Sequence, residues 1–116
     1  MQLTWNKCNG DVWCNLYSVN LSHAHFDNMH GVYIIWHGGA TPSTVYVGQG
    51  FVRGRLIEHK ANPQIQRYSQ LGLYVTWASV AQTYRDGVEA WLAAALHPKE
   101  GQAHPNSQPI QVNLPW

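Results

Sequence analysis

Two tyrosines, an arginine and a histidine are the residues of this chain whose types and spacing best suit a chemical role. The first tyrosine closes the string Gly-Val-Tyr at 31–33, and the second opens Tyr-Val-Gly at 46–48. Arg55 and His59 follow four residues apart, so on a helix they would share one face. A guanidinium binds phosphate oxygens through charge-assisted, bidentate hydrogen bonds. An imidazole exchanges protons near neutral pH, so this set favours chemistry on a phosphate ester.

A β-hairpin is predicted to position the two tyrosines. Residues 32–36 and 44–47 are β-branched or aromatic runs, and the segment between them contains glycine, threonine and proline. Because side chains alternate across a strand, Tyr46 is expected on the same face as Thr44. Pairing of the two strands can then bring Tyr33 and Tyr46 to one side of the sheet.

Three further elements are predicted after the hairpin. Residues 51–62 show helical spacing and stop before Pro63, which places the arginine and the histidine on a helix. Residues 73–78 alternate in the manner of a third strand. A second helix, N-capped by Thr83, carries an apolar stripe over 87–96 and ends at the following His-Pro pair.

Composition describes one folded domain with a weak net charge. The chain has 116 residues, 45% of them hydrophobic, which is enough for one core without a disulfide framework or structural metal. Its formal charge of +1 is small for a protein that holds nucleic acid through many phosphates. Cations gather only locally, over residues 53–67, where the predicted contacts to nucleic acid are Arg53, Lys60 and Arg67.

The remaining segments carry weaker signals. No apolar run reaches the length of a signal peptide or a membrane span, so a soluble, cytoplasmic protein is expected, and Cys8 and Cys14 are expected as reduced thiols. Residues 1–30 are predicted to be an extension, with a candidate strand near residues 13–21, packed on a domain that spans 31–116 and ends in an irregular, proline-containing tail. The histidines of residues 23–30 lack the spacing of a zinc site, so we expect them at the surface and in turns.

The two strings and the residues after them resemble the active-site core of the GIY-YIG nuclease family, over roughly residues 31–106. The resemblance implies an α/β (α+β) fold with a small three-stranded antiparallel sheet flanked by helices. It implies one Mg²⁺ or Mn²⁺ bound by Glu89. Its other implied catalytic residues are Tyr33, Tyr46, Arg55 and His59, supported by Gly31, Gly48 and Asn106.

The function implied by this resemblance is that of a metal-dependent endonuclease that hydrolyses DNA phosphodiester bonds, with RNA not excluded as substrate. The base is either Tyr33 in concert with His59 or His59 acting directly on water, because a tyrosine with an ordinary pKa is a poor base at neutral pH. Arg53 is a rival to Arg55, although only Arg55 keeps the four-residue step to the histidine. Target specificity is left to the extension, a partner protein, a homo-oligomer or a branched substrate. The alternative is a nuclease-like module that binds nucleic acid or protein without cutting.

Overall fold

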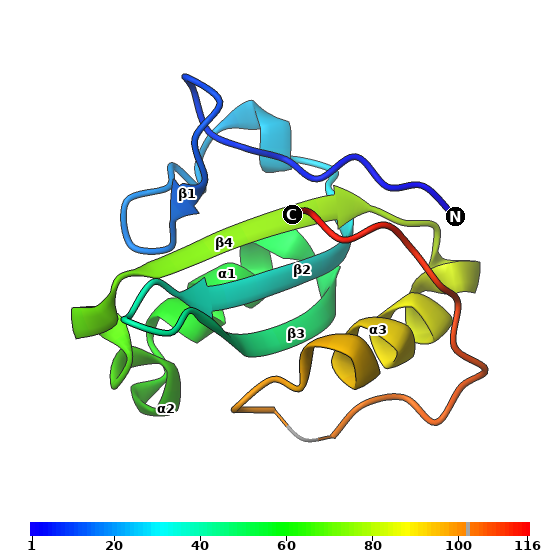
Figure 1. Cartoon of the computed structure of the whole chain (residues 1–116). Helices are drawn as coiled ribbons and strands as arrows, with labels where there is room; N and C mark the ends of the chain where they lie inside the picture. Colours follow the sequence, from blue (N-terminus) through cyan, green and yellow to red (C-terminus); the bar gives the residue numbers. More distant parts are fainter. Residues whose placement is uncertain (102) are drawn as a thin grey trace.

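A hairpin of two long strands forms the centre of the fold. In the computed structural model, which describes residues 1–101 and 103–116, β2 (His30–His37) pairs antiparallel with β3 (Ser43–Phe51). On its other side β2 pairs with β4 (Leu73–Ser79), and β1 (Cys14–Asn15) pairs with the far edge of β4. The order is therefore β1-β4-β2-β3 (Figure 1).

The predicted α+β class with an antiparallel sheet is confirmed, but the sheet has four strands where three were expected. The additional strand is β1, which comes from the N-terminal extension and is only two residues long. It adds to the open edge of β4, where Cys14 lies opposite Val75. An edge strand left unpaired exposes backbone donors and acceptors, and β1 satisfies part of this edge.

Three α-helices lie in the described residues: α1 (Val52–Lys60), α2 (Pro63–Gln66) and α3 (Gln82–Leu96). The first predicted helix ends at Lys60 rather than at residue 62, because Asn62 caps the separate helix α2 through its side chain. Proline suits the first position of that helix, where its missing N–H is not needed. Two short 3₁₀ helices, η1 (Ala24–Phe26) and η2 (Ser69–Leu71), complete the elements.

For the last helix, α3, the prediction is wrong at the start and right at the end. Thr83 lies inside α3, so its predicted role as N-cap is wrong; the N-cap is Ala81, which makes no side-chain capping bond. The predicted end is confirmed, because His97 adopts a left-handed conformation with φ 49° directly after Leu96. Its backbone N–H still donates to the carbonyl of Ala93, which closes the last turn.

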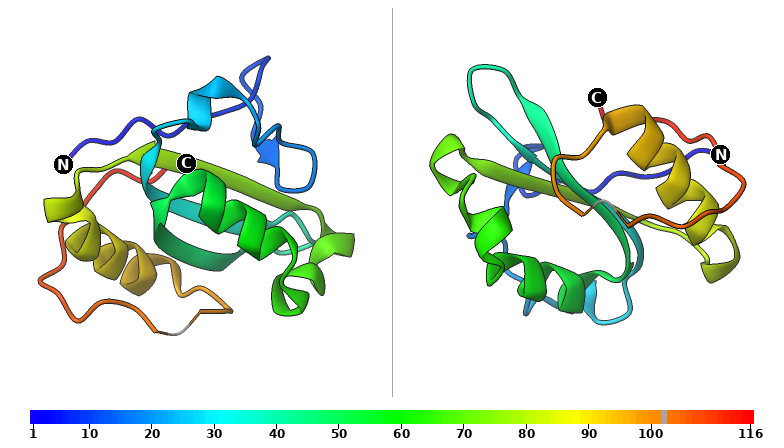
Figure 2. Two further views of the ribbon diagram at one scale, coloured as in Figure 1. Left: turned by 180° about the vertical axis from the view of Figure 1, so that it is seen from behind. Right: turned by 90° about the horizontal axis from the view of Figure 1, so that it is seen from below.

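Helices cover both faces of the sheet, and each face has its own core (Figure 2). Because neighbouring side chains of β2 point to opposite faces, Tyr33 and Ile35 join the core under α1, whereas Val32 and Ile34 join the core under α3. The α1-side core also contains Val52, Leu56, Ile65, Leu73, Val75 and Trp77. The α3-side core also contains Val47, Ala78, Val80, Val88, Leu92 and Val112.

A β-bulge in the hairpin changes which residues share a face. Ile35 pairs with Tyr46, whereas the next residue, Trp36, pairs with Thr44, so Val45 is the additional residue of β3. Both Val45 and Tyr46 consequently contact the α1-side core. The expectation that Thr44 and Tyr46 share a face is therefore wrong, because a bulge inserts one residue into the alternation.

The N-terminal extension contributes to both cores. Leu3 and Trp5 pack against the α3-side core, and Leu16 and Phe26 are buried in the α1-side core. The extension is also tied to the C-terminal tail, since the side chain of Asn113 bonds both the N–H and the carbonyl of Leu3. None of the helices in residues 1–101 and 103–116 is long and apolar enough to cross a membrane.

Cys8 and Cys14 form a disulfide, so the expectation of reduced thiols is wrong. That expectation rested on compartment alone, which says nothing about how close two thiols lie in the fold. The six-residue separation is closed by a turn in which Gly10 and Asp11 both have positive φ, and a backbone bridge joins Cys8 to Val12.

We expect reduction of this disulfide to lower the free energy of unfolding by roughly 2 kcal/mol, because a cross-link over so short a loop removes limited entropy from the unfolded chain. Urea unfolding of the oxidised and the reduced protein measures the difference. A Cys8→Ala/Cys14→Ala variant is the control and should not respond to reductant. An unfolding curve of the native chain that reductant leaves unchanged would contradict the expectation.

Candidate active site

A tyrosine, a histidine and a second tyrosine meet on the α1 side of the sheet. The hydroxyl of Tyr33 lies 2.6 Å from Nε2 of His59, within hydrogen-bond distance. The ring of Tyr46 stacks parallel to that of Tyr33, with centroids 6.1 Å apart, and its centroid is 4.2 Å from that of His59. The structure thus brings together three of the residues that the sequence predicted as catalytic.

The local sequence explains this meeting. Tyr33 lies in the middle of β2 opposite Gly48, and Tyr46 lies two register positions further along, opposite Ile35. Helix α1 begins immediately after β3, so the chain turns back over the same face, and His59 in its last turn points inward with 7% of its surface exposed. The four-residue step from Arg55 to His59 keeps both on one side of α1.

Burial sets the protonation of the hydrogen-bonded pair. Tyr33 is 1% exposed, and this burial raises the pKa of its hydroxyl well above the usual value near 10. Burial also lowers the pKa of His59 to about 4. At neutral pH the tyrosine is therefore protonated and the imidazole is neutral, so His59 rather than a Tyr33 phenolate is the group able to accept a proton.

The predicted supporting glycines allow close approach. A Cβ atom at Gly48 would overlap the hydroxyl of Tyr33, so a side chain there would displace the hydrogen bond to His59. A Cβ atom at Gly31 would overlap the carbonyl of Ala78 on β4. Gly48 therefore makes room within the site, whereas Gly31 supports it indirectly, through the packing of β2 against β4.

Arg55 presents an exposed guanidinium beside the two tyrosines. Its Nε donates to the carbonyl of Gln49 at 3.1 Å, and its side chain is 51% exposed. Glu58 lies 3.9 Å away, a loose ion pair at the surface. Among the charges near Tyr33 and Tyr46, Arg55 is the one that lowers the pKa of each hydroxyl, although burial outweighs it.

Arg53, the rival of Arg55, is committed to the N-terminal extension. Its guanidinium donates to the carbonyls of Leu21 and His23 and to the carboxylate of Asp27, at 2.7, 2.9 and 2.8 Å. These contacts hold the extension against α1, so the structure does not support its predicted contact with nucleic acid. Of the two arginines, Arg55 is the one whose guanidinium is left exposed to bind a phosphate.

Of the other two predicted contacts to nucleic acid, Arg67 is engaged in an ion pair within the described residues and Lys60 is not. Lys60 is partly exposed at the end of α1 and forms no ion pair with any residue of the described chain. Arg67 forms an ion pair with Glu100 at 2.5 Å, and the hydroxyl of Tyr68 donates to the same carboxylate oxygen at 2.9 Å. Arg67 therefore holds the segment after α3, and the predicted contact of Lys60 with nucleic acid stays a prediction.

Glu89 is buried on α3 and is paired with a histidine that the sequence did not single out. One of its carboxylate oxygens accepts a hydrogen bond from Nδ1 of His104 at 2.9 Å. The negative charge of Glu89 raises the pKa of both Tyr33 and Tyr46, in addition to burial. The carboxylate therefore acts electrostatically on the same site as the tyrosines.

Asn106, the predicted supporting amide, is exposed and lies outside this contact, two residues after the histidine that reaches Glu89. The residues from 104 to 106 read His-Pro-Asn, and only the family pattern pointed to the asparagine. A histidine in a proline-containing tail carries no periodic signal, so only its titratable side chain could have marked it.

The segment after α3 closes the outer edge of β3. The backbone N–H groups of Lys99 and Glu100 donate to the carbonyls of Thr44 and Val45, at 3.2 and 2.8 Å. Gly101, with φ 69°, lies against the ring of Tyr46 so closely that a Cβ atom would overlap it. This segment thereby covers the sheet edge and one side of the Tyr46 ring.

The acidic and imidazole groups of the described residues do not form a ready-made metal cluster, since no three of them gather around one point. In the histidine-rich segment, His25 accepts a hydrogen bond from Trp77 Nε1, and Asp27 pairs with Arg53. Glu89 has one oxygen that no described residue bonds. A Mg²⁺ ion held by one carboxylate, with water and phosphate as its other ligands, fits this donor set.

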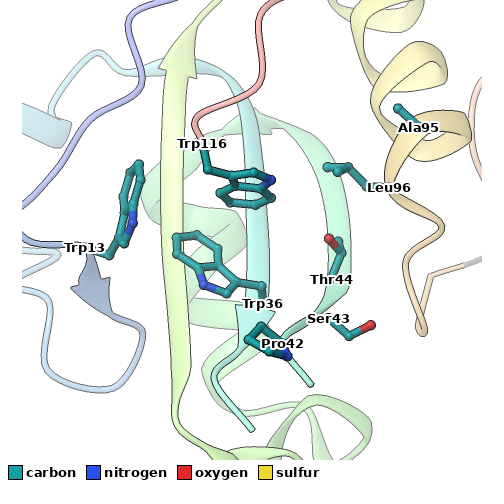
Figure 3. A pocket seen from close by; sticks show the side chains of 8 residues that line it. All are labelled: Trp13, Trp36, Pro42, Ser43, Thr44, Ala95, Leu96 and Trp116. Atoms are coloured by element: carbon teal, nitrogen blue, oxygen red, sulfur yellow. The ribbon is translucent and has the colours of Figure 1, made fainter. Parts of the chain in front are cut away.

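A separate cavity of about 480 Å³ opens on the α3 side of the sheet (Figure 3). Three indole rings shape it, those of Trp13, Trp36 and Trp116, and the end of α3 forms the opposite wall. Trp36 and Trp116 meet edge to face with centroids 5.1 Å apart. None of the predicted site residues lines this cavity, so it is distinct from the candidate active site.

Comparisons of the chain with protein-family models, with curated proteins and with solved structures found no match.

We expect the His59 environment to make stability depend on pH. A histidine in the unfolded chain titrates near 6.5, whereas burial lowers the pKa of His59 to about 4. The unfolded chain therefore binds more protons between these values, and the free energy of unfolding falls as pH falls. Between pH 7 and pH 4.5 the loss from this residue is about 2 kcal/mol.

Urea unfolding at the two pH values tests this, with His59→Gln as the comparison. The glutamine amide oxygen can accept the hydrogen bond from the Tyr33 hydroxyl in place of Nε2 but does not titrate. The variant should therefore lose about 2 kcal/mol less than the native chain on acidification. Equal losses in the two proteins would show that His59 is not the group responsible.

Proposed function

We propose that this chain is a metal-dependent endonuclease that hydrolyses DNA phosphodiester bonds, with a site similar to that of GIY-YIG nucleases. The observation that carries the proposal is the hydrogen bond between Tyr33 and His59, with Tyr46 stacked on Tyr33 and an exposed Arg55 whose charge acts on both tyrosines. These groups supply a proton acceptor, an orienting hydroxyl and a phosphate-binding cation on one side of a small sheet.

In the proposed mechanism His59 is the final proton acceptor. The attacking water gives a proton to the hydroxyl oxygen of Tyr33 while that hydroxyl gives its own proton to Nε2 of His59. This relay needs no free phenolate, which the raised pKa of Tyr33 disfavours. It is consistent with the lowered pKa of His59, which keeps Nε2 unprotonated before the reaction.

The remaining groups bind and orient the phosphate. Arg55 would hold a non-bridging oxygen through its exposed guanidinium. The hydroxyl of Tyr46, which is less buried than that of Tyr33, would orient the water or the phosphate. Glu89 would hold Mg²⁺ or Mn²⁺, which supplies electrostatic stabilisation of the departing 3′ oxygen when bound.

The charge of the chain limits the way in which it binds its substrate. With a formal charge of +1 and two of its arginines engaged in internal contacts, the chain offers few phosphate contacts. Non-specific affinity for duplex DNA should be weak at physiological salt. A partner protein or a homo-oligomer would supply target specificity, and RNA is the other substrate class to be tested.

A second candidate function is a nuclease-like module that binds without cutting. The observation that favours it is the burial of Tyr33, whose hydroxyl lies against the backbone of Gly48 and is shielded from bulk water. In this case Arg55 and Lys60 would still bind a phosphate backbone, but no water would reach the relay. Cleavage assays separate the two candidates.

The cytoplasmic location predicted from the sequence stays a prediction. The disulfide between Cys8 and Cys14 argues for an oxidising compartment instead, because cytosolic thiols are normally kept reduced.

We expect plasmid DNA to be nicked in the presence of Mg²⁺ or Mn²⁺ and to stay intact with EDTA. Glu89→Gln should lower the cleavage rate at least about 100-fold, since one electrostatic contact to a transition state has an effect of this size. Asp86→Asn, an exposed carboxylate three residues earlier on α3, is the matched control and should cleave normally. Nicking by the Glu89 variant at the native rate would refute its role, and binding without nicking by the native chain would favour the second candidate.

We expect Arg55→Lys to lower turnover about 100-fold while changing DNA affinity less than threefold, because lysine keeps the charge but loses the bidentate geometry. Arg53→Lys is the matched control, two residues away on the same helix. It should lower the free energy of unfolding and leave turnover per folded molecule unchanged. Equal losses of turnover and affinity at Arg55 would reduce it to an affinity residue.

A further inference from the structure

The contact between Glu89 and His104 joins two parts of the chain that approach the site from different directions. Glu89 projects from the buried side of α3 with 6% of its surface exposed. His104 follows 15 residues later, in the tail that turns back past α3 (Figure 1). Their side chains are 8% and 17% exposed, so the hydrogen bond between them is largely shielded from water.

Contacts on both sides of His104 hold this part of the tail in place. Before it, Glu100 is bonded by Arg67 and Tyr68, and its backbone N–H donates to Val45 on β3. After it, the N–H of Ile110 donates to the carbonyl of Gly87 on α3 at 3.0 Å. A Cβ atom at Gly87 would overlap Ile110 and the backbone of Gln108, so the tail packs directly on the helix there. His104 is therefore placed by the fold and not only by its own bond to Glu89.

The chemistry of the two groups defines the direction of the bond. A carboxylate only accepts hydrogen bonds, so Nδ1 of His104 carries the proton and donates it. Nε2, the opposite ring nitrogen, is buried and has no hydrogen-bond partner among the residues that the structure describes. The His104 ring therefore contacts Glu89 through Nδ1, at one carboxylate oxygen. The other oxygen has no hydrogen bond to a described residue.

We propose that His104 is a positioning residue for the cation at Glu89. It holds one carboxylate oxygen and so fixes the Glu89 rotamer, and the second oxygen would be the one that binds Mg²⁺ or Mn²⁺. This inference rests on the proposed role of Glu89 as metal ligand. Hydrogen-bonding partners of metal ligands typically change metal affinity by 10- to 100-fold when they are removed.

The test is a direct titration of the full chain with Mn²⁺, followed by electron paramagnetic resonance of the free ion and without any nucleic acid. His104→Ala should raise the Kd for Mn²⁺ about 10- to 100-fold. His104→Asn should restore most of the affinity, because its amide N–H can take the place of Nδ1–H and it has no counterpart of Nε2. His97→Asn is the matched control, in an exposed left-handed position that asparagine tolerates, and should bind like the native chain.

The outcomes separate this inference from the proposed function. A Kd of His104→Ala within threefold of the native value overturns the positioning role and leaves the metal role of Glu89 intact. An asparagine variant as weak as the alanine variant, with circular dichroism showing both folded, also overturns it, because the donated hydrogen bond would then not be the cause. Absence of Mn²⁺ binding by the native chain contradicts the proposed metal site itself, and the inference falls with it.

Discussion

The register of β2 is the constraint on which the rest of this structure depends. The strand is paired along both edges, with β3 and with β4, and it is covered on both faces by helices. Tyr33 lies between Gly48 on one side and Trp77 on the other. A slip of one residue would turn its ring to the α3 side, away from His59, and would bring Ile34 to the site instead. The geometry of the candidate site and the packing of the two hydrophobic cores therefore depend on the same strand pairing.

Burial then gives the Tyr33–His59 pair its chemical character. It disfavours the charged form of each partner, so it raises the pKa of the phenol and lowers that of the imidazole. In the resting protein the two groups therefore form a neutral hydrogen bond, 2.6 Å long, with no charge on either group. Arg55 lowers the pKa of both partners from the surface, and the negative charge of Glu89 on α3 raises that of Tyr33. In the proposed function, a phosphate bound by Arg55 would change the electrostatic field at Tyr33 and His59.

Local patterns in the sequence predict the hairpin, the main helices and β4, because each is long enough to show β-branched runs or helical spacing. The same patterns predict that Tyr33, Tyr46 and His59 approach one another. They indicate a strand near residues 13–21 but not that it is only two residues long, and they do not predict the bulge at Val45, which no residue type marks. The disulfide depends on how the extension folds over β4, which is a tertiary property.

Local sequence patterns also do not predict which groups the charged side chains will contact. Arg53 and Arg55 look equivalent on a helix, yet one binds the extension and the other faces solvent. Arg67 looks like a nucleic-acid contact, but its partner, Glu100, is 33 residues away in the chain. His104 reaches Glu89 only because the tail is anchored on both sides of it. Such long-range contacts decide which candidates belong to the site.

The most direct test of the central claim is the origin of the oxygen in the cleaved product. A defined DNA duplex is incubated with the full chain and Mg²⁺ in water enriched in oxygen-18, and the new ends are analysed by mass spectrometry. Attack by a water that the Tyr33–His59 pair deprotonates should place one heavy oxygen on a 5′-phosphate and leave an unlabelled 3′-hydroxyl. Intact DNA, or cleaved ends without the label, would contradict the claim that this site hydrolyses phosphodiester bonds.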